Sequence, residues 1–184
     1  MDPSQVSRDE SGVMRCRECG FGYNLAPGEI AERSRSGVGA VRAAIAGVPE
    51  ASRHRRPSPG VWSVNAYVAH LADAAGVIRD RVRAIMELDR PALPYHDQDR
   101  AVEEGNADEQ SADVSLRRLE DAVAGFQRLI MPLAPEQWDR VGVHERAGEV
   151  TLREIAHDIP HELEHHAMDI RRVGAFVSGD GAER

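Results

Sequence analysis

The chain has 184 residues, enough for one domain with its own core. Hydrophobic residues make up 41% of the sequence but aromatic residues only 4%, so Ala, Val, Leu and Ile must build the core, which favours packed helices over a sheet sandwich or barrel. The net charge is −8, all 23 cationic residues are Arg, and no basic stripe carries interleaved aromatic residues. Nucleic-acid binding, which needs clustered cations, is therefore not expected.

The N-terminal stretch MDPSQVSRDESGV is polar and lacks the apolar region of a secretion signal. The sequence also has no apolar run of about 18 residues, so we expect no membrane span and a cytoplasmic location. Residues 1–13 are expected to be disordered. The predicted organisation is a flexible arm with a Cys knuckle over 1–27, a helical bundle over 28–175 and a polar tail over 176–184.

Apolar residues at helical spacing predict four long helices. Their predicted bounds are Gly28 to about Val48, Ser63 (as N-cap) to about Leu88, Val114 to Leu133, and Thr151 (as N-cap) to about Val173. Between them, residues 91–111 read as a long acidic loop, and 141–150 as a short hairpin or a plain crossing between helices. With no convincing strand elsewhere, the predicted fold is an all-α four-helix bundle preceded by a short CxxC arm.

The last helix, TLREIAHDIPHELEHHAMDIRR, carries two competing pairs of metal-ligand residues spaced one turn apart. On a helical wheel, Glu162 and His166 fall within or beside the apolar stripe. His161 falls on the side expected to face solvent, and His165 falls on the flank. The wheel favours the first pair, although a kink at Pro160 inside the helix would rotate its second half.

A third candidate ligand, His70, lies at the edge of the apolar face of the second predicted helix. A carboxylate and imidazoles directed into an apolar bundle carry a free-energy cost unless something pairs them. A metal on His70, Glu162 and His166 would do so. The alternatives are a buried hydrogen-bonded pair and a solvated histidine face. Three protein ligands leave a tetrahedral metal one open position, the catalytic pattern.

Two segments, WSVNAYVAHLADA and TLREIAHDIPHELEHHAMDI, together resemble the DinB/YfiT-like metal-binding four-helix bundle superfamily over roughly residues 28–175. The shared features are a Trp-led helix with a His eight residues later and a final helix reading His-His-x-x-(Gln/Asp)-Ile. The resemblance implies His70, Glu162 and His166 as metal ligands. Many members have His where this chain has Glu162, whereas the mycothiol-dependent maleylpyruvate isomerase-like branch has Glu.

That departure keeps His161 and His165 as a substitute ligand pair. The resemblance further implies a divalent metal, zinc with nickel as the alternative, and a low-molecular-weight thiol such as mycothiol or bacillithiol as cosubstrate. A metal-bound thiolate would attack an electrophilic small molecule, so the expected activity is a thiol S-transferase or a related small-molecule enzyme. The same site would also activate water. The alternative is a non-catalytic metal-binding or stress-related module, with a homodimer as one arrangement.

The pair Cys16-x-x-Cys19 is similar to half of a zinc ribbon, but a closed structural site needs four ligands and the sequence has no second Cys pair. Three interpretations involve chemistry: completion by a histidine such as His54, a site shared between two chains, or a redox motif. The fourth is a free, reduced pair on a flexible arm.

The acidic loop over 91–111 offers further donors. His96, Asp97 and Asp99 would reach the mouth of a metal site if the loop folded over it. The simpler interpretation is a solvated lid.

Overall fold

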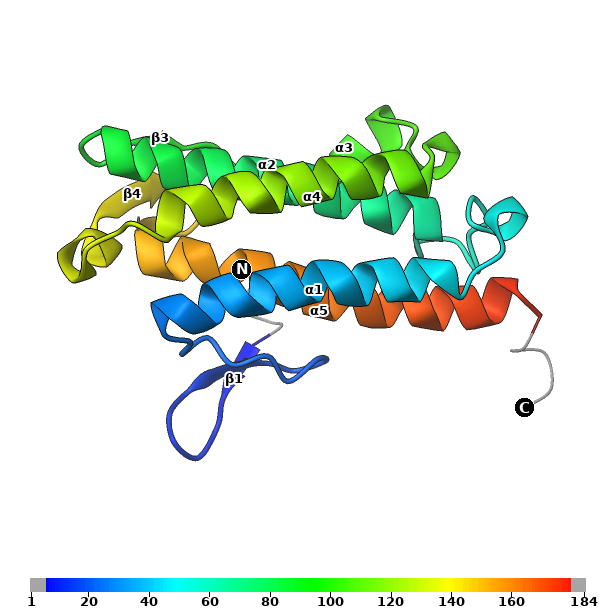
Figure 1. The fold of residues 1–184 in the computed structure, drawn as a ribbon, viewed down its shortest axis with the longest axis horizontal. Helices are drawn as coiled ribbons and strands as arrows, with labels where there is room; N and C mark the ends of the chain where they lie inside the picture. Colours follow the sequence, from blue (N-terminus) through cyan, green and yellow to red (C-terminus); the bar gives the residue numbers. More distant parts are fainter. Residues whose placement is uncertain (1–5, 180–184) are drawn as a thin grey trace.

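The computed structural model describes residues 6–179. Its four long helices are α1 (Pro27–Ala46), α2 (Val64–Glu87), α4 (Ala112–Ile130) and α5 (Leu152–Val177). They form a bundle in which α1 packs on α5, α5 on α2 and α2 on α4. Helices α1 and α5 run in one direction and α2 and α4 in the other (Figure 1). The predicted helical bundle is confirmed at this level.

The chain between α2 and α4 must travel back along the bundle, because these neighbouring helices run the same way (Figure 1). It contains the short strand β3 (Ala92–Leu93), the helix α3 (Gln98–Glu104) and a 3-10 turn (Ala107–Glu109). The prediction of a plain loop over 91–111 was therefore wrong. Asp97 caps α3 by accepting a hydrogen bond from the backbone N–H of Arg100 at 3.1 Å. Of the α3 residues only Val102 is buried, so the sequence carries little apolar signal there.

Two small sheets accompany the helices. In the first sheet, β1 (Val6–Arg8) pairs with β2 (Met14–Cys16). In the second sheet, β3 pairs in parallel with β4 (Val141–His144), and β4 forms an antiparallel hairpin with β5 (Gly148–Thr151). The hairpin over 141–150 is confirmed, and β5 begins directly after the turn with Gly148 at a φ of +75°. The predictions that the chain has no strands elsewhere and that residues 6–13 are disordered were wrong. Residues 1–5 lie outside the described residues.

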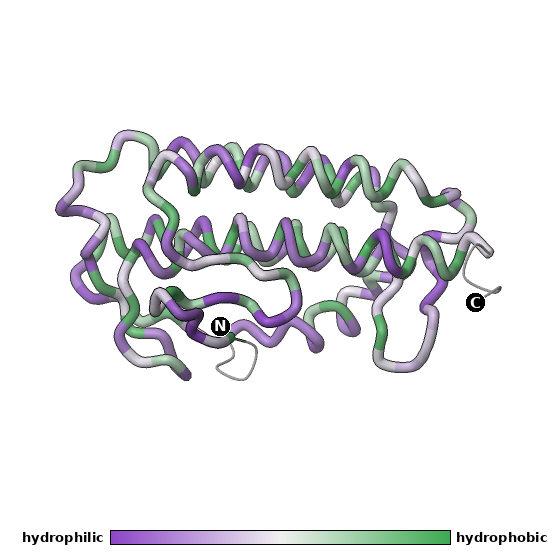
Figure 2. Tube along the Cα trace, turned by 90° about the horizontal axis from the view of Figure 1, so that it is seen from below, coloured by the Kyte–Doolittle hydropathy of each residue, from purple (hydrophilic) through white to green (hydrophobic). Residues whose placement is uncertain are grey.

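Capping residues set the first turns of α2 and α5. Ser63 accepts a hydrogen bond from the backbone N–H of Ala66 at 3.1 Å, and Thr151 with Glu154 forms a capping box at the start of α5. Both predicted starts are confirmed, whereas α5 runs past the predicted end to Val177. Hydrophobic and hydrophilic residues alternate turn by turn along the long helices (Figure 2), as expected when one face of each helix is buried.

Helices α1 and α5 approach closely at Gly37. A Cβ atom on Gly37 would lie 2.7 Å from Cβ of Leu163, so only glycine allows this separation. Leu163 directly follows Glu162 in the sequence, so this close approach of α1 lies next to a candidate ligand.

No helix of the described residues is long and apolar enough to cross a membrane. The division at residues 27 and 175 into arm, bundle and tail stays a prediction, and residues 180–184 of the tail lie outside the described part.

Candidate metal centre

Three side chains predicted as ligands converge between α2 and α5. Nε2 of His70 lies 3.1 Å from Oε2 of Glu162, and Nε2 of His166 lies 3.2 Å from the same oxygen. One donor atom from each residue lies within 4.8 Å of the other two. His70 is buried at 3% exposure, whereas the Glu162 side chain keeps 25%, so the cluster is reached from one side.

Helix geometry explains this convergence. Glu162 and His166 are one turn apart on α5, and His70 lies two turns after the Ser63 cap on the neighbouring α2. Helix α5 continues through Pro160, and Glu162 and His166 still lie against His70 of α2. The structure thus brings the three residues together, while their role as ligands stays a prediction.

Asp169 orients the imidazole of His166. Its Oδ2 lies 2.9 Å from Nδ1 of His166, which leaves Nε2 directed at Glu162. Metal-binding histidines usually make such a contact with a carboxylate through their second nitrogen. No role was predicted for Asp169 from the sequence, although its i,i+3 spacing from His166 was a usable signal.

The pKa values of Glu162, His166 and Asp169 are shifted by their contacts with one another and by burial. Burial raises the pKa of Glu162, but contacts with the imidazoles of His161, His166 and His70 outweigh it and hold the pKa well below its usual value. Burial lowers the pKa of His166, whereas Asp169 and Glu162 raise it. Burial likewise raises the pKa of Asp169, and His166 lowers it. Two ionised carboxylates therefore flank the imidazoles, an arrangement suited to a cation.

Aromatic side chains from the start of α2 cover one side of the cluster. The ring of Trp62 lies 4.9 Å from that of His70, and Tyr67 lies 5.3 Å from His166, centroid to centroid. They exclude water from that side and hold both imidazoles in place.

The donor set fits a divalent metal. Two imidazole nitrogens and one carboxylate oxygen are a common ligand set for zinc, and nickel also accepts imidazole. Within the described residues, no fourth donor joins the group of His70, Glu162 and His166. A four-coordinate ion held there would keep one position for a substrate or water.

Asp158 is a further candidate functional residue, one turn before Glu162 on α5. Burial, together with the charge of Glu162, raises the pKa of Asp158 to about 6. A carboxyl group with this pKa exchanges its proton near neutral pH, as a general base must. No general base was predicted from the sequence, although Asp158 has i,i+4 spacing from Glu162.

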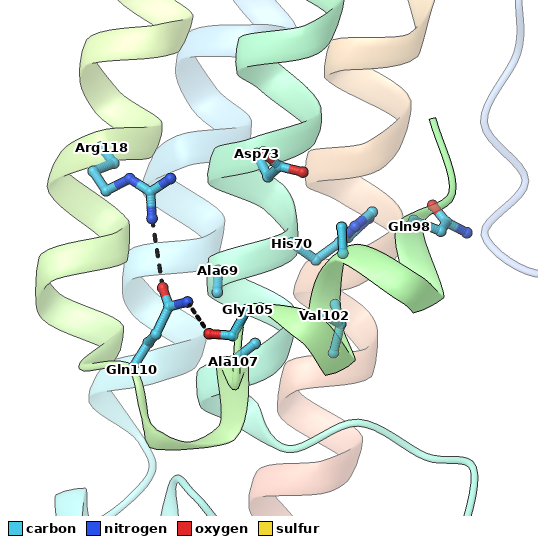
Figure 3. Close-up of a pocket in the computed structure, with 10 residues that line it drawn as sticks. Ala69, His70, Asp73, Gln98, Val102, Gly105, Ala107, Gln110 and Arg118 are labelled. Atoms are coloured by element: carbon cyan, nitrogen blue, oxygen red, sulfur yellow. Dashed lines mark hydrogen bonds between the residues drawn. The ribbon is translucent and has the colours of Figure 1, made fainter. Parts of the chain in front are cut away.

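A hollow of about 190 Å³ lies between α2 and the segment containing α3 (Figure 3). It meets the cluster at His70, which lines it together with Asp73. At its far end Arg118 donates to Gln110, whose amide in turn donates to the Gly105 carbonyl (Figure 3). The ring nitrogens of His70 point away from that end. The hollow is therefore a space beside the cluster, not the cluster itself.

The loop donors do not join the cluster. Nε2 of His96 lies 2.8 Å from Oδ2 of Asp73 on α2, Asp97 caps α3, and Asp99 is exposed. His96 thus fastens the segment before α3 to α2, and the structure favours a positioning role over direct ligation.

His161 does not face solvent as the wheel predicted. Its side chain is only 12% exposed, because the rings of Phe21 and Tyr23 lie 5.4 and 5.3 Å from its own. It belongs to a second donor group with Cys16, Cys19 and His165. Within the described chain this group does not include His54, and His161 and His165 lie with the two cysteines instead of with His70.

Four long helices with a three-donor cluster between two of them define the chain as a helical bundle with a candidate metal centre. Residues 37–170 match the family model of the DinB superfamily, so the chain belongs to that superfamily. No curated protein matches the chain.

Two solved structures show the same fold. YfiT from Bacillus subtilis, described as a probable metal-dependent hydrolase with an unusual four-helix bundle topology, aligns with a TM-score of 0.73 and 18% identity over 82% of this chain and 88% of its own. The mycothiol-dependent maleylpyruvate isomerase aligns with a TM-score of 0.64 and 18% identity over 79% of this chain. The chain spans only 61% of that isomerase.

Proposed function

We propose that the chain is a metal-dependent enzyme that acts on a small molecule, with His70, Glu162 and His166 holding the metal. The observation that supports this most is the convergence of three donors from two helices, with no fourth protein donor among the described residues. Zinc is the metal we propose, because two imidazoles and a carboxylate suit it, and nickel is the alternative.

The reaction we propose is transfer of a low-molecular-weight thiol of the mycothiol or bacillithiol type to an electrophilic substrate. When bound, the metal would lower the pKa of a thiol or water at its open position. Asp169 orients His166, and the aromatic wall of Trp62 and Tyr67 keeps water from one side of the cluster. Asp158 would accept the proton released by the nucleophile. The mycothiol dependence of the isomerase with this fold supports a thiol as cosubstrate.

Hydrolysis is the second candidate. Asp158, whose pKa is raised to about 6, would take a proton from a water as readily as from a thiol, and YfiT is described as a probable hydrolase. A non-catalytic metal-binding or stress-related module is the third, and it would require a further ligand that closes the metal.

One set of measurements tests these candidates. The full chain is loaded with zinc, and its binding of mycothiol, bacillithiol and glutathione is measured by calorimetry. Turnover is then followed with a panel of electrophiles in the presence of each thiol, and with a panel of esters and amides without thiol. We expect thiol binding and turnover in wild type, and loss of both in His70→Ala. The control His54→Ala, a histidine outside both donor groups, should match wild type.

The proposed function fails if metal-loaded wild type binds no thiol and turns over neither panel. Turnover of esters or amides without thiol would instead favour the hydrolase.

We further propose a cytoplasmic location, which the two free thiols at Cys16 and Cys19 support. A homodimer and the absence of a nucleic-acid partner stay predictions from the sequence.

A further inference from the structure

The segment 14–25 presents two thiols on one side of a tight turn. The backbone N–H of Gly20 donates to the carbonyl of Cys16 at 2.9 Å, and Gly20 has a φ of +74°, in the left-handed region that favours glycine. This turn places the side chains of Cys16 and Cys19 together against α5. Both thiols are free, and Cys16 is 3% exposed.

Helix α5 supplies two imidazoles to the same place. His161 and His165 are one turn apart, and one donor atom from each lies within 4.8 Å of the others and of both sulfurs. Sγ of Cys16 lies 3.6 Å from Nδ1 of His165. Zinc bonds of about 2.3 Å to sulfur and about 2.0 Å to nitrogen at a tetrahedral angle give a separation of roughly 3.5 Å. The observed distance is therefore that of a tetrahedral edge.

In His161 and in His165, one ring nitrogen lies toward the cysteines and the other lies toward a carboxylate. Nε2 of His161 is buried with no hydrogen-bond partner among residues 6–179, while its Nδ1 lies 3.6 Å from Oε1 of Glu162. His165 directs Nδ1 at Cys16 and has Nε2 3.6 Å from Oδ2 of Asp169. Histidines that bind a metal through one nitrogen characteristically direct the other at a carboxylate.

We propose that Cys16, Cys19, His161 and His165 bind one Zn²⁺ in a closed, structural site separate from the His70 cluster. The spacing Cys-x₂-Cys and His-x₃-His is that of zinc sites with two thiolates and two imidazoles. Each thiol releases its proton to solvent on binding. Two thiolates then neutralise the ion, so a neutral complex occupies this largely buried position. Four protein ligands leave no open position for a substrate.

The site fastens the N-terminal segment to the bundle. Apart from the four ligands, the backbone N–H of Leu25 donates to Nε2 of His157 at 3.0 Å, and the Arg33 guanidinium lies 4.7 Å from the centroid of the Phe21 ring. These contacts hold the end and the middle of segment 14–25. The metal would hold its first turn, which has few apolar side chains of its own to bury.

The test uses the full chain loaded with Co²⁺, and separately with Zn²⁺, because cobalt bound to thiolate shows a charge-transfer band that cobalt bound only to nitrogen and oxygen lacks. We expect two zinc ions per chain and the thiolate band in wild type. Cys19→Ser should lose the band and one zinc. His70→Ala should lose one zinc and keep the band, and the control His54→Ala should keep both zinc ions and the band.

A cobalt-loaded wild type without the thiolate band overturns the proposal, and so does Cys19→Ser that keeps the full metal content of wild type. Should Cys19→Ser fail to fold, the wild-type spectrum decides alone. This result is independent of the proposed function: a wild type with one zinc and the thiolate band supports this site and contradicts the His70 site.

Discussion

The two donor clusters share one helix but differ in almost every other respect. The His70 cluster lies inside the bundle, has three donors from α2 and α5, and stays accessible through Glu162. The cysteine cluster lies on another face of α5, has four donors, and is covered by segment 14–25. Consecutive residues alternate between them, with His161 beside Glu162 and His165 beside His166. A step of about 100° per residue lets one helix supply two faces in this way.

The two clusters differ as structural and catalytic metal sites differ. Four ligands in a largely buried position suit a structural ion, whereas three ligands with a nearby titratable carboxyl suit a catalytic ion. The clusters also share two carboxylates, since Glu162 places one oxygen toward each and Asp169 contacts both His165 and His166. The following changes test whether the two sites are as distinct as their geometry indicates.

The largest effect is expected for Glu162→Gln. Loss of the only anionic donor in the His70 cluster should remove one metal ion per chain and reduce turnover to background, as measured by elemental analysis and the activity panels. The matched control is Glu164→Gln on the same helix. Its ion pair with Arg33 is partly exposed, so we expect unchanged metal content and a stability loss below about 1 kcal/mol. Equal metal content in the two variants would contradict the assignment of Glu162.

The double change Cys16→Ser, Cys19→Ser should act on stability. Loss of a structural ion worth about 2 kcal/mol or more would lower the Tm by roughly 4–8 °C for a chain of this size. Hydrogen exchange should rise in segment 14–25 and stay unchanged in α4. A variant with the wild-type Tm and the same protection of segment 14–25 would show that apolar contacts alone hold the segment.

Asp169→Asn should weaken metal binding at the His70 cluster by about 10- to 100-fold, because His166 loses the partner that orients its ring. Competition with a chromogenic zinc chelator measures this affinity. Asp169 is also near His165, so the variant shows whether the cysteine site depends on the same carboxylate. Wild-type affinity at both sites would show that Asp169 supports metal binding at neither.

The pH dependence of turnover should identify Asp158. The pKa of this group is raised to about 6, so its unprotonated form, the base, accumulates as pH rises through 6. The rate should therefore fall below pH 6 in wild type. Asp158→Asn should be slower by about 10²-fold, the lower end expected for loss of a general base, and should lack this limb. Persistence of the limb in the variant would assign it to another group.

The smallest effect on metal binding is expected from a change in helix packing. Gly37→Ala forces α1 and α5 apart at Leu163 and should cost about 1–3 kcal/mol, measured by denaturant unfolding. Gly39→Ala, on the same helix with nothing within 4 Å of the added Cβ, should instead stabilise the chain by up to about 1 kcal/mol. Because both clusters depend on α5, Gly37→Ala should weaken metal binding at both equally. A loss at only one site would mean that the close approach of α1 does not set the position of the whole helix.

The sequence predicted those parts of the fold whose signals are local. Ser63 and Thr151 marked the starts of α2 and α5 because a capping side chain acts within one turn of itself. Helix α3 was not predicted, because it buries only Val102. Its formation depends on the Asp97 cap and on its contact with α2. Such a helix has no apolar periodicity to read.

The same distinction applies to the donors. Glu162 and His166 could be placed by a helical wheel because the apolar residues of α5 itself define the core direction. His161 could not, because its cover comes from a segment far away in the sequence: Cys16 and His165, which are in contact, are 149 positions apart. A helical wheel describes one helix only, so it cannot show that a distant segment such as 14–25 covers the face that carries His161.

Anomalous diffraction from zinc-loaded crystals of the full chain is the most direct test of two distinct metal centres on α5. We expect two peaks per chain: one among His70, Glu162 and His166 with a non-protein ligand at its fourth position, and one enclosed by Cys16, Cys19, His161 and His165. No peak at the first position, or a first peak closed by a fourth protein side chain, would contradict the proposed catalytic centre. No peak at the second would contradict the structural site.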